Sequence, residues 1–309
     1  MENTFLKHIS RSTPHHRLVP LGIGDDAAIL GHTDNLDTVV TTDMLCDGVH
    51  FLSDEVTPEL IGRKALAVNL SDIAAMTATP VAAFVSLALP RDLEHDYVYR
   101  LMNGIRELAD EFDVAIAGGD TNSWDGKLAI NVCLSGIVAR RNAKLRSTAE
   151  PGDWILVTGE LGGSILGRHL TFRPRVDEAL KLAVAADINA CMDISDGLLL
   201  DLSRMMEASN TGAVLDYDQI PISPAARQRA IETGLPPIEH ALSDGEDFEL
   251  LFTLPAMEAR TLLANPPFTD VRLSHIGKII GEASGLFRRV PDGNLLNVQP
   301  KGFEHEWHP

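Results

Sequence analysis

The sequence predicts an α+β protein with two domains. Its 309 residues exceed what one hydrophobic core usually holds. Strands and helices alternate over the first half, and a second alternating set follows a turn at Glu150-Pro151-Gly152-Asp153. The composition, 45% apolar and 23% charged, is ordinary for a globular protein. We therefore expect one α+β domain at residues 1–145 and a second at 146–309.

The first half is expected to begin with a short helix and a polar loop over residues 1–20, and the pair His15-His16 fits an exposed loop better than a metal site. A helix starts at Thr57, because Pro58 suits the first helical position and Glu59 the first turn, and it continues to about Met76. The other elements expected here are strands at 37–43, 81–89 and 128–138, an amphipathic helix at 92–112, and a short buried strand at 114–117 that leads into a loop at Gly118-Gly119-Asp120.

The second half repeats the alternation of strands and helices. Gly159 to Ser164 lies between a strand and a helix, which fits either a phosphate-binding turn or a turn that only redirects the chain. The expected strands are 154–158, 190–192, 213–217, 248–253, 271–280 and 284–290, and the expected helices are 177–186, 198–209, 223–233 and 255–264.

The net charge of −18 limits the possible partners. It comes from 44 acidic and 26 basic side chains. Nucleic acids and anionic membranes both require a basic face, so we expect neither as a partner. Small polyanionic substrates remain possible because bound divalent cations reverse the local sign of the charge.

The cysteines and the N-terminus favour a cytoplasmic protein. Cys46, Cys133 and Cys191 are scattered, so we interpret them as buried thiols in a reducing compartment rather than as disulfides or zinc ligands. No apolar signal segment is visible in residues 1–10, and the apolar stretch at 65–90 is too interrupted by polar residues to span a membrane.

Five turns along the chain combine aspartate with glycine, serine or threonine. A bare Asp25-Asp26 pair beside the apolar run Ala27 to Leu30 is costly unless a cation neutralises it. Carboxylate and hydroxyl oxygens are the ligands that Mg²⁺ prefers. The turns are Gly22-Ile23-Gly24-Asp25-Asp26, Thr41-Thr42-Asp43, Asn69-Leu70-Ser71-Asp72, Gly118-Gly119-Asp120-Thr121 and Asp193-Ile194-Ser195-Asp196-Gly197.

Helical spacing predicts that Asp72 points inward. It continues the apolar line Ile61, Ala65, Val68 of its helix. A carboxylate in that position is either hydrogen-bonded to a neighbouring cap or amide, or it is a metal ligand. The residues alone leave both possibilities open.

Common nucleotide and hydrolase motifs are absent from the sequence. Gly126-Lys127 and Gly277-Lys278 are not followed by Ser or Thr, so neither belongs to a Walker A motif, and no dinucleotide, zinc-protease or nucleophile-elbow motif occurs. Dispersed carboxylates suit Mg²⁺ ions, which phosphoryl transfer needs in order to neutralise charge on the transferred group. The residues therefore indicate a Mg²⁺-dependent enzyme that acts on phosphates.

Together these motifs resemble those of the thiamine-monophosphate kinases, a family of the aminoimidazole-ribonucleotide-synthetase-like superfamily. The resemblance covers about residues 20–303 in matching order and adds Asp47-Gly48-Val49-His50-Phe51, Lys64 to Met76 and Gly245-Glu246-Asp247-Phe248-Glu249-Leu250 to the acid turns. It implies an N-terminal domain whose small sheet pairs across a homodimer, and a C-terminal layered α+β domain. It also implies direct in-line transfer of a phosphoryl group from ATP to thiamine monophosphate.

The resemblance also implies roles for single residues, carried over motif by motif. Asp43, Asp120 and Asp196 would be catalytic. ATP would be held by Gly119, Asp120, Arg146 and Ser195, and thiamine monophosphate by His50, Glu246 and Phe303. The Mg²⁺ ligands would be Asp26, Thr41, Thr42, Asp43, Asp72, Asp120, Asp193 and Asp196. On its own, the basic run Arg140 to Arg146 fits a solvated linker, and the resemblance favours a phosphate contact for Arg146.

Three positions depart from the family pattern, and other functions stay open. Thr77 stands where the family usually has Gly, which suggests an altered helix exit; Phe303 stands where Tyr is common, and Asp244 where a second Gly is common before Glu246. The alternatives are another enzyme of the superfamily, such as a purine-pathway cyclase or a hydrogenase-maturation protein, and a non-catalytic protein that stores Mg²⁺-nucleotide or thiamine phosphates. The complete set of acids argues against the storage function.

Overall fold

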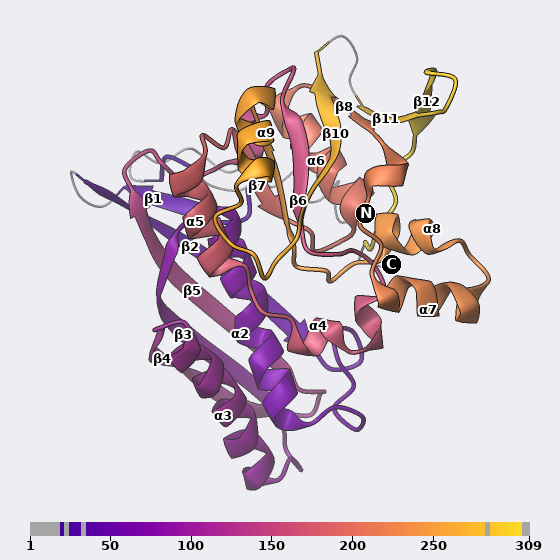
Figure 1. Ribbon diagram of the computed structural model, residues 1–309. Helices are drawn as coiled ribbons and strands as arrows, with labels where there is room; N and C mark the ends of the chain where they lie inside the picture. Colours follow the sequence, from indigo (N-terminus) through magenta and orange to yellow (C-terminus); the bar gives the residue numbers. More distant parts are fainter. Residues whose placement is uncertain (1–18, 22–24, 32–34, 282–284, 305–309) are drawn as a thin grey trace.

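The computed structural model describes residues 19–21, 25–31, 35–281 and 285–304 and contains two α+β halves, each built on one mixed sheet (Figure 1). The predicted fold class is therefore confirmed. The helix and loop expected at residues 1–20, with His15-His16, lie almost entirely outside the described residues, as do the glycines of the turn at 22–24.

The N-terminal sheet has the strand order β1-β2-β5-β3-β4. All neighbours are antiparallel except β3 and β4, which run parallel because α3 crosses over between them. The predicted strands at 37–43, 81–89 and 128–138 and both helices are confirmed, whereas β1 was not predicted. The elements are β1 (Ala28–Gly31), β2 (Leu36–Cys46), α2 (Pro58–Ala75), β3 (Thr79–Pro90), α3 (His95–Glu111), β4 (Ala115–Trp124) and β5 (Ala129–Ala139).

The prediction for β4 was wrong in length and in burial. The strand does not end before Gly118 but continues through Gly119 and Asp120 to Trp124. Almost all of its residues are exposed, because β4 pairs with β3 on one side only and stands at the end of the sheet.

The C-terminal sheet has the strand order β12-β11-β8-β10-β6-β9-β7. The strands and long helices expected in this half are confirmed within a few residues, whereas α8 and β12 were not predicted. The elements are β6 (Trp154–Thr158), α4 (Arg168–Thr171), α5 (Val176–Ala185), β7 (Ala190–Asp193), α6 (Leu198–Ser209), β8 (Gly212–Leu215), α7 (Pro224–Thr233), α8 (Pro237–Ser243), β9 (Leu250–Leu254), α9 (Ala256–Ala264), β10 (Leu273–Ile280), β11 (Gly285–Arg289) and β12 (Leu295–Val298). Short 3₁₀ turns lie at Arg146–Thr148, Ser164–Leu166 and Tyr217–Gln219.

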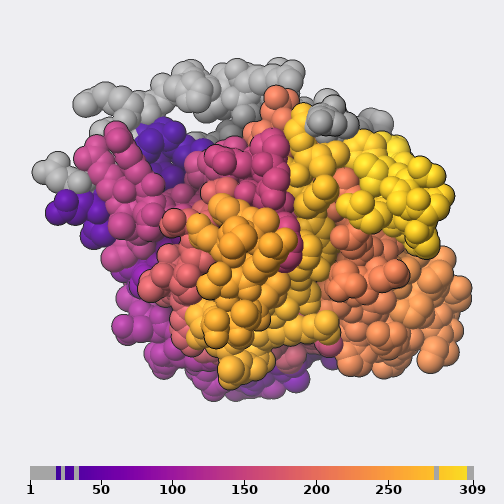
Figure 2. Space-filling model, turned by 45° about the horizontal axis from the view of Figure 1, so that its top comes forward, coloured from indigo at the N-terminus to yellow at the C-terminus, as the bar shows by residue number. Residues whose placement is uncertain are grey.

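Helix α2 is shared by both halves. It packs on β2, β5 and α3 of its own half and contacts α4, α5 and β7 of the other (Figure 1). Leu66, Leu70 and Ile73 are completely buried, in a core that also includes Phe252 of β9. In the space-filling view the two halves form one continuous body, with the indigo and purple N-terminal residues at the side and bottom of the orange C-terminal half (Figure 2). Helix α2 therefore connects the two halves.

The ends of α2 follow the sequence prediction, with one difference at the start. Thr57 has the expected extended backbone and Pro58 the first helical position, but the Thr57 side chain makes no capping hydrogen bond. At the other end Thr77 N–H donates to Ala74 and Ala78 N–H to Ile73. This pair of bonds is a Schellman turn, in which glycine usually occupies the place of Thr77.

The three cysteines are free thiols, as expected. Cys191 is buried, but Cys46 and Cys133 are only half-buried, because they lie on the face of the N-terminal sheet opposite α2. Among the described residues, no helix combines the length and the apolar character that crossing a membrane requires.

Candidate active site

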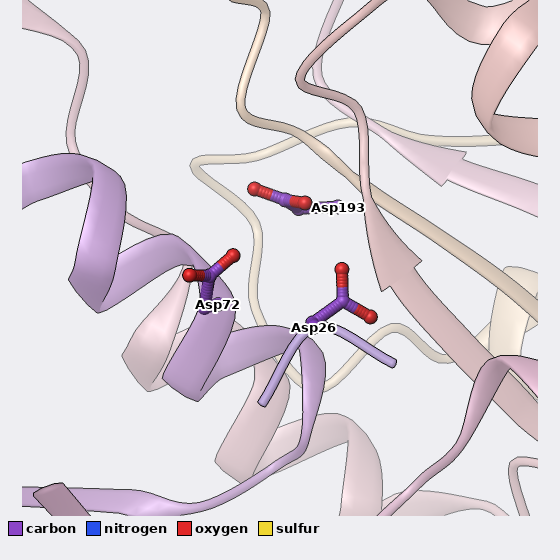
Figure 3. A group of neighbouring side chains, drawn as sticks. All are labelled: Asp26, Asp72 and Asp193. Carbon is purple, nitrogen blue, oxygen red and sulfur yellow. The ribbon is translucent and has the colours of Figure 1, made fainter. Parts of the chain in front are cut away.

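Three aspartates from distant parts of the chain meet between the two halves. Asp26 precedes β1, Asp72 lies near the end of α2, and Asp193 ends β7, and one carboxylate oxygen of each lies within 4.8 Å of the others. In the close-up the three carboxyl groups surround a common space (Figure 3). Three of the five acid turns expected to share a site therefore converge at these residues.

Hydroxyl groups orient two of these carboxylates. Thr41 Oγ1 donates to Asp72 at 2.5 Å, and Ser71 Oγ donates to Asp193 at 2.5 Å. Asp72 is thus both hydrogen-bonded to a neighbour and part of the cluster, so the two interpretations left open by the sequence do not exclude each other. The Thr41 hydroxyl reaches the cluster through Asp72.

The electrostatics of the cluster favour a bound cation. Burial, and then the charges of neighbouring aspartates, raise the pKa of Asp72 and of Asp193 well above the usual range of a carboxyl group. Burial also raises the pKa of Asp43. Oδ2 of Asp26 is buried and has no hydrogen-bond partner. An all-oxygen donor set with one unpartnered oxygen fits a hard divalent cation such as Mg²⁺.

A guanidinium group partly neutralises the acids. Arg146 Nη2 lies 2.8 Å from Oδ1 of Asp26, and Arg146 Nε lies 3.4 Å from Oδ1 of Asp25. The sequence places no basic residue next to Asp25-Asp26; the fold supplies one from the first turn after the N-terminal sheet. Burial and Asp26 raise the pKa of Asp25 to about 7, although Arg146 opposes this shift.

A cavity of about 480 Å³ opens beside the cluster. Its walls alternate between charge and apolar surface, with Met44, Val49, Val68 and Ile165 among the apolar residues. Eight residues predicted from the sequence line it: Asp43, His50, Asp72, Asp193, Ser195, Asp196, Glu246 and Phe303. Residues predicted as metal ligands, as nucleotide contacts and as substrate contacts therefore line the same cavity.

Asp201 organises the loop that carries Ser195 and Asp196. Its Oδ2 accepts hydrogen bonds from the backbone N–H groups of Ser195, Asp196 and Gly197, at 2.9 to 3.1 Å. Arg204 Nη1 then bridges Asp201 and Asp196. Neither residue was predicted from the sequence, although an aspartate in the first turn of a helix after a glycine loop is a known N-terminal pattern.

The wall of the cavity also includes His50, Glu246 and Phe303. His50 Nδ1 accepts the backbone N–H of Cys46 at 3.0 Å, so the neutral ring carries its hydrogen on Nε2. Glu246 has a left-handed backbone (φ 63°), and its N–H donates to Ser195 at 2.6 Å. Phe303 N–H donates to the Asp196 carbonyl, and Phe303 is 49% exposed. Strained backbone of this kind is common where a side chain must be aimed at a ligand.

Two residues behind this wall were not predicted from the sequence. Lys64 Nζ lies 2.5 Å from Oε1 of Glu246, and His169 Nδ1 lies 3.2 Å from Oε2. Lys64 could have been found, because it shares the inner face of its helix with Ile61 and Val68. No pattern in the sequence marks His169.

The structure does not bring Thr42, Gly119 and Asp120 to the cluster. The Thr42 hydroxyl donates to Asn131 on the face of the N-terminal sheet opposite α2. Gly119 is aligned with Asp43 across the sheet, through the paired residues Val132 and Val85. Three strand spacings separate Gly119 from Asp43, which corresponds to roughly 14 Å. Asp120 is exposed on β4 and accepts from Asn122. The roles expected of these three residues stay predictions.

Comparison with known proteins identifies relatives along the whole chain. Residues 24–138 match the family model described as AIR synthase related protein, N-terminal domain, and residues 150–287 match the corresponding C-terminal domain. The thiamine-monophosphate kinase of Rhodopirellula baltica is 44% identical over 314 residues, which cover 99% of this chain and 97% of the relative.

Solved structures agree with this relationship. The structure of AaThiL complexed with AMPPCP and TMP has a TM-score of 0.82 and is 32% identical, over 98% of this chain and 95% of that one. The hydrogenase maturation protein HypE of E. coli has a TM-score of 0.70 over 86% of this chain and 87% of its own, but at 19% identity it shows a shared fold alone.

Proposed function

The chain belongs to the thiamine-monophosphate kinase family of AIR synthase related proteins, and we propose from this premise that it transfers the γ-phosphoryl group of ATP to thiamine monophosphate, giving thiamine diphosphate and ADP. One observation carries the proposal: a single cavity joins the acid cluster to His50, Glu246 and Phe303. The sequence identity to a thiamine-monophosphate kinase over 99% of the chain supports the same acceptor.

Mg²⁺ would be held by Asp26, Asp43, Asp72 and Asp193. When bound, it would neutralise the phosphates of two anionic reactants that otherwise repel each other. The unpartnered oxygen of Asp26 and the raised pKa values of Asp72 and Asp193 support this assignment.

Side chains of the cluster and of the cavity would position the two substrates. Arg146 and the Ser195 loop would hold the nucleotide, because the Arg146 guanidinium group contacts the cluster. His50 Nε2–H is a donor suited to the acceptor phosphate, since Nδ1 is engaged by Cys46. A half-exposed Phe303 ring and the Glu246 carboxylate suit a cationic thiazolium ring. Transfer would be direct and in line, without a phosphoenzyme.

A homodimer would reconcile Thr42 and Asp120 with this site. Both lie where the N-terminal sheet is uncovered, together with the exposed apolar side chains Met44, Phe84 and Ile137. Exposed apolar residues on an uncovered sheet face, with an unpaired edge strand, are typical of an interface. We propose that two copies pair through this face and that each site receives Gly119 and Asp120 from the partner subunit. The domain limits 1–145 and 146–309 are part of the same proposal.

The direct test is formation of thiamine diphosphate by the purified chain with ATP, Mg²⁺ and thiamine monophosphate. Release of ADP should require thiamine monophosphate and should not occur with unphosphorylated thiamine or with precursors of purine synthesis as acceptors. If no thiamine diphosphate forms while ATP and Mg²⁺ bind, the kinase proposal fails and a storage function would explain the site better.

A further inference from the structure

Lys64 is a fully buried cation next to the cavity. Its side chain is completely buried, and its ammonium group has three close neighbours. Nζ lies 2.7 Å from the carbonyl oxygen of His50, 2.5 Å from Oε1 of Glu246 and 3.0 Å from Nδ1 of His169. A buried lysine is costly unless its charge is balanced and its hydrogen bonds are made. The Glu246 carboxylate balances the charge, and this carboxylate and the His50 carbonyl accept the hydrogen bonds of Lys64, whereas His169 Nδ1 donates to Oε2 of Glu246.

The neighbours of Lys64 come from separate parts of the fold. His50 follows β2 in the N-terminal half, His169 lies on α4, and Glu246 precedes β9. Helix α2 carries Lys64 between them. Its ammonium group therefore contacts both His50 and Glu246, which line the cavity from the two different halves. Arg63, the preceding residue, also crosses this boundary by donating to the carbonyl of Phe172 at 2.8 Å.

We propose that Lys64 is a positioning residue for the acceptor substrate: it holds the Glu246 carboxylate in the geometry that binds thiamine monophosphate. This inference rests on the proposed function. Lys64 itself touches no substrate, because it is fully buried and reaches the cavity only through His50 and Glu246.

The charge state of Glu246 agrees with this role. Burial raises the pKa of Glu246, but the hydrogen bond from His169 and the charge of Lys64 lower it, and the net pKa lies below the usual range of a glutamate. Glu246 is thus an oriented carboxylate with both oxygens engaged. Its strained backbone shows that the fold, and not local preference, holds it there.

The test compares Lys64→Met, Glu246→Gln, the double variant and the control Arg175→Met. The control deletes another cation, which is only partly buried, pairs with Glu249 and does not line the cavity. Michaelis constants for thiamine monophosphate and for ATP are measured separately, with the melting temperature of each variant. Loss of a charge-assisted hydrogen bond predicts that Lys64→Met raises the KM for thiamine monophosphate about tenfold or more. The KM for ATP should change by less than about twofold, and Arg175→Met should lower the melting temperature while leaving the ratio of the two constants unchanged.

The double variant keeps the test decisive even where Lys64→Met alone does not fold, because it removes both charges and leaves no unpaired one. If Lys64 acts through Glu246, the double variant has the same KM for thiamine monophosphate as Glu246→Gln, within about twofold. A further tenfold rise, a parallel rise for ATP, or an unchanged KM in Lys64→Met would overturn the inference.

Calorimetric binding of thiamine monophosphate to the same variants separates this inference from the proposed function. If the wild type binds thiamine monophosphate but makes no product, the kinase proposal fails, and the comparison of affinities still decides the role of Lys64. If the wild type does not bind it, both are overturned.

Discussion

Arg146 and Asp26 form an ion pair in which guanidinium Nη2 lies 2.8 Å from carboxylate Oδ1, at the edge of the acid cluster. The pair joins the first turn after the N-terminal sheet to the loop before β1. It leaves Oδ2 of Asp26 buried without a partner. The same carboxylate therefore has one oxygen on a fixed cation and the other buried without a partner, as expected if Arg146 links the proposed nucleotide and metal sites.

Arg146→Met should weaken both nucleotide binding and folding. Asp25 and Asp26 would be left as buried acids without their counterion, which predicts a loss of about 3 kcal/mol in the free energy of unfolding. The KM for ATP should rise about tenfold or more, because a charged contact to phosphate is removed. Saturating Mg²⁺ should restore more stability to the variant than to the wild type. Arg140→Met, an exposed change in the same basic run, serves as the control in thermal unfolding and kinetics.

Mg²⁺ should bind more tightly as the pH rises. The pKa values of Asp72 and Asp193 are raised in the folded protein by burial and by neighbouring acids, so without metal the folded state holds more protons above pH 3.8 than the unfolded state does. Stability from these groups is therefore present at low pH and is lost as the pH rises towards their folded pKa values. A cation must displace those protons in order to bind.

Thermal unfolding in chelator and in Mg²⁺ between about pH 5 and pH 8 measures this linkage. In chelator, the wild type should lose stability with rising pH relative to Asp72→Asn, which cannot take up the proton. The gain in melting temperature on adding Mg²⁺ should increase with pH in the wild type and be much smaller in Asp72→Asn. A gain independent of pH, or equal in both proteins, would contradict a metal site at these residues.

Asp43→Asn and Asp120→Asn should each be inactive and yet complement each other. If one site combines Asp43 of one chain with the partner subunit's Asp120, a mixed dimer has one intact site. A random mixture is half mixed dimers, so co-expression should recover about a quarter of the wild-type specific activity.

The outcome of this mixing decides where the site lies. A site confined to one chain would always contain one defective residue, and the mixture would remain inactive. Each variant should retain the wild-type melting temperature in the absence of Mg²⁺ within a few degrees, which excludes misfolding as the cause. Full activity of either single variant would remove that residue from the catalytic set.

Periodicity predicted the elements well because their residues face a core on one side. The line Ile61, Ala65, Val68, Asp72 predicted both a helix and an inward carboxylate, and Asp72 is in the cluster. Strand β4 was misjudged, because an edge strand with both faces exposed has no apolar alternation to detect. Local patterns thus predict the elements that build the core more reliably than those at the margin of the sheet.

The site was predicted only as a set of motifs, because convergence in space is not a local property. Five acid turns look alike in the sequence, yet the structure joins Asp26, Asp72 and Asp193 and leaves Asp120 on the far strand of the sheet. Long-range partners such as Arg146 for Asp26 and His169 for Glu246 are separated by more than seventy residues, and no spacing rule relates them. Asp201 and Lys64, in contrast, lie on helices in positions that helical spacing could have revealed.

Thr77→Gly should stabilise the protein without changing its activity. Thr77 follows α2 with a φ of 51°, in the left-handed region where a β-branched residue is strained and glycine is not. Its hydroxyl is also buried without a hydrogen-bond partner. Relief of both costs should exceed the entropy that glycine loses on folding and raise the free energy of unfolding by about 1 kcal/mol.

Denaturant unfolding of Thr77→Gly measures this change in the free energy of unfolding. Thr77→Ala, which removes the hydroxyl but keeps a Cβ in the strained backbone, should lie between the glycine variant and the wild type. If glycine were no more stable than alanine, backbone strain would not be the cost at this position, and the orphaned hydroxyl alone would account for any gain.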